Sequence, residues 1–451
     1  MNTQQRGSRP YEGDPLLTDQ YTLTMSQSFW LHGQAGETST FEMFVRTLPE
    51  ARNYLVFAGL EWVIDYLREL RFAEADLDFL ASLGIYQQGF LDYLADLRFT
   101  GELRALPEGT IVPAQAPMLT VTAPRAEAAI IEPAILALVN HQTMIASKVS
   151  RIVHAAAGRP VWDFSMRRLH GLGPAVGVAR AAYLAGATGS ATVAAGRDLG
   201  IPTTGTMAHH YIQSFGPDHE VDAFVQFLRD YPDNGVLLVD TYDTLRGVQR
   251  ACDAAEITGI TPKAIRLDSG DLDQLSADAR QILDLNGLGE TRILASNDLD
   301  EYSIAELVAA DAPIDSYGVG TKLGTSSDAA YLGGVYKLSE QETDDQRPDK
   351  VMKLAKNKLT DPGKHQLWRQ NGIYTLGMVD EDLDGEGLLQ TVVSDGEIVA
   401  ELPSLDQIKA LHRKELELLA DEHKVLEHAP IALNRSDRLN AMRLQLSGIA
   451  D

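Results

Sequence analysis

Cysteine is almost absent from this chain of 451 residues, which contains only Cys252. A single cysteine excludes an intramolecular disulfide framework and a zinc site built from cysteines. Because Cys252 lies in the helix-like run 245–257, we expect it to be a buried structural thiol rather than a nucleophile.

Positive charge is also scarce, since 39 lysines and arginines face 64 acidic residues and the formal net charge is -25. A field of that sign disfavours non-specific binding to nucleic acid or anionic lipid, although local arginines can reverse it inside a cleft. Residues 1–15 contain no apolar signal region, and no uncharged apolar stretch is long enough to span a membrane. We therefore expect a soluble, cytoplasmic protein that binds neither nucleic acid nor membranes.

Three common motifs are missing. There is no G-x-x-x-x-G-K-[ST] phosphate loop, so any use of ATP needs another kind of pocket. There is no H-E-x-x-H spacing, which disfavours a zinc hydrolase. The run 380–385 starts like a calcium loop, but its twelfth position is Thr391 instead of the required glutamate. We expect an exposed acidic turn there.

What the chain does contain is a series of short apolar runs that end in polar, acidic or glycine-rich residues. They are 161–164, 201–204, 236–240, 264–268, 292–295 and 314–317. Helix-like stretches lie between them, and this alternation predicts βα units and a parallel sheet. Functional residue types at the ends of successive strands favour an α/β barrel. Its active site would lie at the end of the barrel where these strands finish. An open doubly wound sheet would also place its site there, and six runs do not assure a regular eight-stranded barrel.

Two histidines, His209 and His210, follow the strand-like run 201–204 through small residues. Imidazole can carry a phosphoryl group or move a proton near neutral pH. An isolated loop histidine is more often a structural residue. The repetition of polar strand ends around this one favours chemistry at His209.

Charged residues follow the same runs. The cations are Arg167, Arg168 and Arg266, and the acids are Asp240, Asp243, Asp268 and Asp271. Converging arginines suit phosphate or carboxylate ligands, whereas carboxylates can bind Mg²⁺ or ribose hydroxyls. The combination fits a substrate that carries phosphates and needs magnesium.

A glycine-rich segment, 318–324, follows the last run. Gly318 and Gly320 would let backbone N–H groups point at an anion, and Thr321 adds a hydroxyl. Such a turn is weak evidence alone. Its place after the last strand of a candidate barrel, where phosphate sites are common, strengthens a phosphate-binding interpretation.

The length indicates two or three domains. We expect residues 1–140 and 339–451 to form a smaller α/β domain from both chain ends, with the barrel inserted as residues 141–338. The expected helices of the flanking parts are 16–31, 59–70, 133–157, 404–419 and 430–446. The expected strands lie within 102–122 and at 351–354, 366–369, 373–376 and 389–393.

These residues closely resemble the nicotinate phosphoribosyltransferase family over most of the chain. The motifs that carry the resemblance occur in the family's order. They are 16–21, 54–60, 163–171, 205–209, 238–244, 266–271, 317–321 and 362–366. The resemblance implies a two-domain, type II phosphoribosyltransferase fold with an irregular α/β barrel, working as a homodimer with shared active sites.

The resemblance also implies a reaction. Nicotinate and phosphoribosyl pyrophosphate would give nicotinate mononucleotide and pyrophosphate in NAD salvage, with Mg²⁺. ATP hydrolysis would be coupled through a phosphohistidine, and that role carries over to His209. His210 lies where the family varies and receives no role.

Other roles carry over from the family residue by residue. Tyr21, from the partner subunit, and Phe164 would sandwich the pyridine ring. Arg266 and Thr206 would contact the nicotinate carboxylate. Arg167 would help to hold the phosphate and carboxylate charges, and Asp268 would bind ribose hydroxyls or magnesium. Gly318, Gly320 and Thr321 would hold the 5-phosphate.

Two departures bear on the substrate. Related nicotinamide phosphoribosyltransferases have an aspartate just before the Thr-Val-Ala segment, where this chain has the neutral Ser190-Ala191. An acid there would repel a carboxylate, so the neutral pair favours nicotinate. Ser165-Met166 replaces the family's usual glycine and variable residue, which could alter the turn without removing a charge. The alternatives are another pyridine phosphoribosyltransferase, for quinolinate or nicotinamide, and a non-catalytic relative.

Overall fold

The computed structural model describes residues 13–342, 347–355 and 358–448. The described chain folds into two compact units. The central unit comprises residues 148–330, and the terminal unit combines 13–147 with 331–448. The sequence analysis placed the domain limits at 140/141 and 338/339. Those limits remain a prediction, since this division into compact units does not test them.

The central unit is built on a parallel sheet whose hydrogen-bonded order is β7-β6-β11-β10-β9-β8. All four residues of β9 are buried, as expected for a strand covered on both faces. The six strands are β6 (Val161–Asp163), β7 (Gly189–Ser190), β8 (Val236–Leu238), β9 (Ala264–Leu267), β10 (Arg292–Ala295) and β11 (Ser316–Val319).

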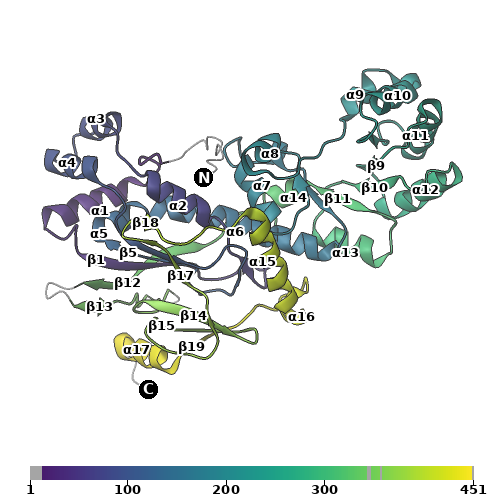
Figure 1. Cartoon of the computed structure of the whole chain (residues 1–451). Coiled ribbons are helices and arrows are strands. Elements are labelled where there is room, and N and C mark those ends of the chain that lie inside the picture. Colours follow the sequence, from purple (N-terminus) through teal and green to yellow (C-terminus); the bar gives the residue numbers. More distant parts are fainter. Residues whose placement is uncertain (1–12, 343–346, 356–357, 449–451) are drawn as a thin grey trace. The chain divides into compact units, whose positions relative to one another are not determined.

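Helices connect these strands, so the predicted βα alternation is confirmed (Figure 1). α10 packs on α11, and α11 packs on α12. The helical segments are η1 (Met166–Arg168), α7 (Ala175–Leu184), α8 (Val193–Leu199), α9 (His209–Gln213), η2 (Pro217–His219), α10 (Glu220–Asp230), α11 (Thr244–Thr258), α12 (Leu272–Leu285), α13 (Glu301–Ala309) and α14 (Thr321–Gly324).

One strand prediction is wrong. The run 201–204 forms no strand, and its Thr203 makes a single parallel bridge to Ser190. Pro202 has no backbone N–H to donate, which weakens any ladder there. The sixth strand is instead the short β7, whose glycine and serine carry no apolar signal.

The terminal unit is built on an antiparallel sheet that combines strands from both ends of the chain, in the order β13-β12-β1-β5-β3-β17-β18. Figure 1 shows purple and green strands side by side in this sheet. Its members are β1 (Thr38–Val45), β3 (Glu102–Ala105), β5 (Leu119–Pro124), β12 (Gly334–Glu342), β13 (Pro348–Lys350), β17 (Gln390–Ser394) and β18 (Glu397–Ile398).

Two smaller sheets complete the terminal unit, in the orders β16-β14-β15-β19 and β2-β4. Their strands are β2 (Leu55–Val56), β4 (Ile111–Val112), β14 (His365–Gln370), β15 (Ile373–Met378), β16 (Glu386–Gly387) and β19 (Leu433–Arg435). The helices are α1 (Gln20–Leu31), α2 (Leu60–Glu69), α3 (Glu74–Ser82), α4 (Gln88–Asp96), α5 (Arg125–Ile130), α15 (Leu405–Leu418), α16 (Asp421–Lys424) and α17 (Asp437–Ser447). The long helix α6 (Glu132–Ala155) contributes residues to both units.

Two expectations for the returning segment are wrong. Residues 351–354 form no strand. The expected helix 430–446 is split into β19 and α17, because Ser436 caps α17 by accepting the Leu439 N–H at 3.1 Å.

Within the described residues, no helix has the length and apolar character needed to cross a bilayer.

Candidate functional site

Arg266 is the centre of a polar cluster at the carboxyl ends of β9 and β10. It points from β9 and is only 7% exposed. Its Nε donates to Ser296 Oγ at 2.7 Å and its Nη2 donates to Asp268 Oδ1 at 2.6 Å. Ser296 Oγ lies 2.6 Å from the same Asp268 oxygen. The three side chains hold one another, so the guanidinium is fixed in orientation before any ligand arrives.

A second acid, Asp240, lies beside Asp268. Asp240 follows β8, and its Oδ2 accepts the Asp268 N–H at 3.0 Å and the Ser269 hydroxyl at 2.6 Å. Its other oxygen, Oδ1, is buried and has no hydrogen-bond partner within the described chain. A buried acceptor without a partner is costly, and here it leaves one carboxylate oxygen available beside the cluster.

His209 begins α9 and joins the same cluster. Its Nδ1 lies 3.1 Å from Thr241 Oγ1, and its Nε2 lies 3.6 Å from Asp268 Oδ2. The side chain is 41% exposed. An accessible imidazole with a hydroxyl on one nitrogen and a carboxylate near the other is oriented for phosphoryl or proton transfer.

Phe164 presents a ring to this cluster from the end of β6. The Arg266 guanidinium carbon lies 5.6 Å from the ring centroid, a distance typical of a cation–π contact. The Phe164 N–H donates to the Val319 carbonyl at 2.8 Å. A Cβ atom at Gly318 would lie 2.5 Å from the ring. Glycine at 318 therefore makes room for the aromatic side chain.

The glycine-rich turn packs tightly against the turn that follows β6. A Cβ at Gly320 would lie 3.3 Å from the Phe164 carbonyl oxygen, and one at Gly324 would lie 2.3 Å from the Ser165 Cβ. Gly320 precedes α14, which Thr321 begins. Close packing therefore accounts for glycines in this segment, independently of any anion that its N–H groups could bind.

Thr206 lies at the edge of the cluster, where its Oγ1 is 3.4 Å from Arg266 Nη1. Arg167 and Arg168 lie on the exposed η1 segment. Two of the four rim acids act as helix caps. Asp243 accepts the Arg246 N–H at the start of α11, and Asp271 accepts the Gln274 N–H at the start of α12.

Tyr21 belongs to the terminal unit, on α1, and the residue is 48% exposed. Burial, together with the neighbouring Glu132 and Asp19, raises the pKa of its hydroxyl. Glu132 in turn lies 3.9 Å from Lys337 Nζ. Tyr21 thus presents an accessible ring whose hydroxyl end lies among charged groups.

Three residues near the site received no role from the sequence pattern. They are Asp163, which ends β6, Ser296, which directly follows β10, and Thr241, which lies three residues after the end of β8. Position near a strand end was the signal for all three, and Asp163 and Thr241 also lie within the family motifs 163–171 and 238–244. Cys252 is buried, as expected, and burial raises the pKa of its thiol to about 11, which disfavours a nucleophilic thiolate.

Metal ligands are few in this arrangement. The described residues contain no group of three or more His, Cys, Asp or Glu side chains placed to hold an ion. Asp240 and Asp268 are the acids that adjoin one another at the rim.

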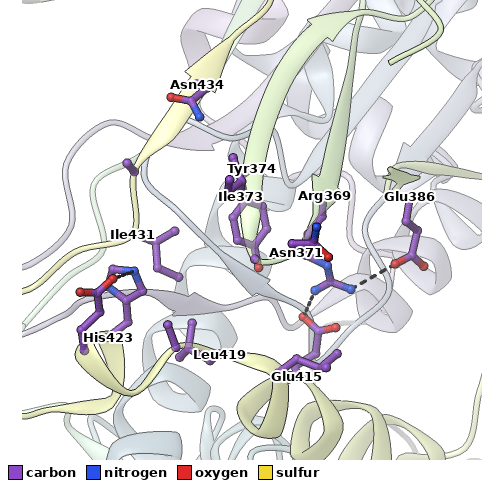
Figure 2. Close-up of a pocket in the computed structure, with 15 residues that line it drawn as sticks. Arg369, Asn371, Ile373, Tyr374, Glu386, Glu415, Leu419, His423, Ile431 and Asn434 are labelled. Atoms are coloured by element: carbon purple, nitrogen blue, oxygen red, sulfur yellow. Dashed lines mark hydrogen bonds and ion pairs between the residues drawn. The ribbon is translucent and has the colours of Figure 1, made fainter. Parts of the chain in front are cut away.

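A separate cavity of about 710 Å³ lies in the terminal unit, between the β14–β15 hairpin and helices α15 and α16 (Figure 2). Arg369 pairs there with Glu415 at 2.5 Å and Glu386 at 3.2 Å. Its lining contains none of the site residues predicted from the sequence. The size of this cavity is therefore no guide to the chemistry.

Comparisons with known proteins agree with this geometry. Residues 16–140 match the model of the nicotinate phosphoribosyltransferase N-terminal domain, and residues 351–431 match that of the C-terminal domain. The nicotinate phosphoribosyltransferase pncB2 of Mycobacterium tuberculosis is 42% identical over 436 residues, 94% of this chain and 92% of that protein. The Bacillus subtilis nicotinate phosphoribosyltransferase is 39% identical over 359 residues, 78% of this chain and 72% of that protein.

Solved structures show the same architecture. The crystal structure of human nicotinic acid phosphoribosyltransferase superimposes with a TM-score of 0.82 at 25% identity, covering 95% of this chain and 99% of that one. Nicotinate-nucleotide pyrophosphorylase from Pyrococcus furiosus shares the fold, with a TM-score of 0.75 at 24% identity, covering 93% and 99%.

The parallel sheet, the composite second unit and these structural matches define an α/β protein of the type II phosphoribosyltransferase class. Within that class, the similarity to known sequences determines the family. The chain belongs to the nicotinate phosphoribosyltransferase family, whose members are enzymes.

Proposed function

We propose that this chain joins nicotinate to phosphoribosyl pyrophosphate, forming nicotinate mononucleotide and releasing pyrophosphate in NAD salvage. The observation that carries the proposal is the buried Arg266 guanidinium, which lies over the Phe164 ring and is braced by Asp268. A cation beside an aromatic face matches a flat ring that bears a carboxylate. Family membership supports the same reaction.

For the base, we assign stacking to Phe164 and carboxylate recognition to Arg266 with Thr206. Nη1 of Arg266 makes only a 3.4 Å contact with Thr206, whereas Nε and Nη2 have short bonds. The nicotinate carboxylate would therefore bind at the Nη1 edge, where the least hydrogen bonding is displaced.

For the sugar phosphate, we assign Asp268 to the ribose hydroxyls and Gly318, Gly320 and Thr321 to the 5-phosphate. Arg167, exposed after β6, would add charge for the phosphates. As the bond at ribose C1 breaks, positive charge develops on the sugar and negative charge on the leaving pyrophosphate. The ring nitrogen of nicotinate then attacks C1, so the protein contributes chiefly positioning and electrostatic stabilisation.

Magnesium fits the acids at the rim. The free, buried Oδ1 of Asp240 and the carboxylate of Asp268 would hold Mg²⁺ directly or through water. When bound, the ion would neutralise charge on the pyrophosphate.

ATP would act as a co-substrate through His209. Its imidazole takes the γ-phosphoryl group, giving phosphohistidine and ADP, and hydrolysis later returns the imidazole and phosphate. The accessible side chain and its contacts with Thr241 and Asp268 support this assignment.

A homodimer with shared sites would supply Tyr21 of one subunit to the base held by the other. The exposed ring of Tyr21 supports this assignment. We also place the enzyme in the cytoplasm, in keeping with its acidic composition.

The test is to incubate the purified chain with nicotinate, phosphoribosyl pyrophosphate and Mg²⁺, with and without ATP. Nicotinate mononucleotide is the expected product, formed faster with ATP. Parallel reactions with nicotinamide and quinolinate distinguish the other pyridine phosphoribosyltransferases. No product from any of the three bases would identify a non-catalytic relative.

A further inference from the structure

Asp163 is a buried carboxylate at the end of β6, and the reaction outlined above does not use it. The residue is 1% exposed. Its Oδ1 accepts the Ser165 N–H at 2.9 Å, and its Oδ2 accepts the Ser190 hydroxyl at 2.7 Å. Burial raises the pKa of this carboxyl, while the hydrogen bonds from Ser165 and Ser190 oppose that rise.

Ser190, at the end of β7, extends the connection into the next turn. Its Oγ also accepts the Thr192 N–H at 3.0 Å, and the Ala191 N–H donates to the Asp163 carbonyl at 2.8 Å. Each of the two turns thus has a backbone N–H held by the Asp163–Ser190 pair. Because the pair is buried, water cannot replace a lost partner without cost.

Phe164 adjoins this connection. Phe164 lies between Asp163 and Ser165, whose N–H the carboxylate holds. On the other side, its own N–H is bound to Val319, and Gly318 leaves space for the ring. These bonds hold the backbone on both sides of Phe164, whose ring lies next to Arg266.

We propose that Asp163 and Ser190 are positioning residues for the pyridine base, because they lock the turn after β6 to the turn after β7 and so set the Phe164 ring. The inference rests on the proposed function. It assigns base capture, rather than phosphoribosyl pyrophosphate binding, as the step that depends on the pair.

The test is steady-state kinetics on Ser190→Ala, which leaves Asp163 Oδ2 and the Thr192 N–H without partners. We expect the KM for nicotinate to rise about tenfold while the KM for phosphoribosyl pyrophosphate changes less than about twofold, as the loss of one buried hydrogen bond predicts. Asp163→Asn keeps an oxygen for the Ser165 N–H, so its nicotinate KM should rise less than that of Asp163→Ala.

Matched controls lie in the same unit. Ser276→Ala removes a buried hydroxyl that donates to a carbonyl within α12. Asp315→Asn alters a carboxylate that accepts a backbone N–H, from Ile293, at the amino end of the parallel sheet. Neither control should change the ratio of the two KM values.

Hydrogen exchange provides a second measurement that does not need turnover. Peptides covering 161–193 should exchange faster in Ser190→Ala than in the unmodified protein and in Ser276→Ala. Unchanged exchange together with equal changes in both KM values would overturn the pair's role while leaving the proposed function intact. An unmodified protein that binds and converts no nicotinate would instead refute the proposed function, and the base-positioning role with it.

Discussion

Arg266 divides its hydrogen bonds unequally among Ser296, Asp268 and Thr206, at 2.7, 2.6 and 3.4 Å. The unequal distances matter because a guanidinium recognises a carboxylate through a planar pair of donors. Asp268 holds one side of the group in place and leaves the Thr206 side for a ligand. The guanidinium of Arg266 is thus held in a fixed orientation on one side and can select the ligand with the other.

Replacement of Arg266 by lysine should therefore reduce the preference for nicotinate over nicotinamide. An ammonium cannot reproduce the planar contact, and the loss of a charge-assisted hydrogen bond corresponds to roughly 1.5–3 kcal/mol, or one to two powers of ten in discrimination. The measurement is kcat/KM for each base. Ala191→Asp should also penalise nicotinate, by charge repulsion.

Arg280→Lys is the control for this change, since Arg280 bonds to Asp284 and to two carbonyls of the α12–β10 region. It should leave base preference as it was. Equal use of nicotinate and nicotinamide by the unmodified protein would contradict this account of Arg266.

His209→Ala should abolish stimulation by ATP and leave slow, ATP-independent synthesis. The transfer at C1 needs positioning and metal, whereas storage of a phosphoryl group needs the imidazole. ATP hydrolysis and nicotinate mononucleotide formation are measured in the same reaction. His210→Ala, at the exposed neighbouring position, should retain both, and undiminished ATPase activity in His209→Ala would refute the assignment.

At the scale of elements, the close approach of β11 to the turn after β6 makes a prediction for Gly318→Ala. The added Cβ would meet the Phe164 ring at 2.5 Å, and overpacking of this kind costs about 1–3 kcal/mol. We expect weaker nicotinate binding together with a lower free energy of unfolding. Gly289→Ala, on the surface, has only the Asp284 side chain near its Cβ, at 3.8 Å, and should change neither.

Helix α15 carries a titratable contact into the terminal unit. His412 is buried and its Nδ1 lies 3.0 Å from the Gly109 carbonyl, and burial lowers its pKa to about 4. The imidazole is therefore neutral in the folded protein at pH values where the unfolded chain is already protonated. Stability associated with His412 is present above about pH 6.5 and is lost as the pH falls toward 4.

The free energy of unfolding should consequently fall by about 2 kcal/mol more between pH 7 and pH 5 in the unmodified protein than in His412→Gln, which cannot titrate. Urea unfolding at the two pH values measures this difference. An identical pH dependence in both proteins would show that His412 is not responsible.

Helices and strands whose apolar residues follow a clear periodic pattern could be predicted from the sequence. Those without such a pattern could not. The strands β6, β8, β9, β10 and β11 match expected apolar runs, and the helices α10, α11 and α12 lie between them, where helix-like stretches were expected. β7 was missed because Gly189 and Ser190 have no apolar pattern, and β1 and β12 were missed although they pair with each other in the large sheet. Pairing over such a separation comes from tertiary structure, which local propensity does not encode.

At the scale of the whole molecule, Tyr21 belongs to the terminal unit and Phe164 to the central unit, and this division makes a prediction about assembly. Tyr21→Ala should weaken nicotinate capture more than phosphoribosyl pyrophosphate binding, by about 0.5–1.5 kcal/mol for one stacking face. If the partner subunit supplies Tyr21, mixing Tyr21→Ala with His209→Ala should regenerate some intact sites. ATP-stimulated activity is measured after subunit exchange has been verified, and no recovery would argue against shared sites.

The sequence by itself determined the class of the protein and the residue types at its rim. Parallel strands place their carboxyl ends at one edge, so polar residues after successive apolar runs had to gather there. Family motifs predicted roles for His209, Arg266 and Asp268, and the structure brings these three side chains together.

Only the tertiary structure decided which polar residues meet and which serve the fold. Asp240 and Asp268 lie together, whereas Asp243 and Asp271, which follow the same two strands three residues further along the chain, cap helices. Asp163 and Ser190 are 27 positions apart and became a pair only through the adjacency of β6 and β7. Residue type is local information, but burial and hydrogen-bond partners depend on segments that the chain brings together when it folds.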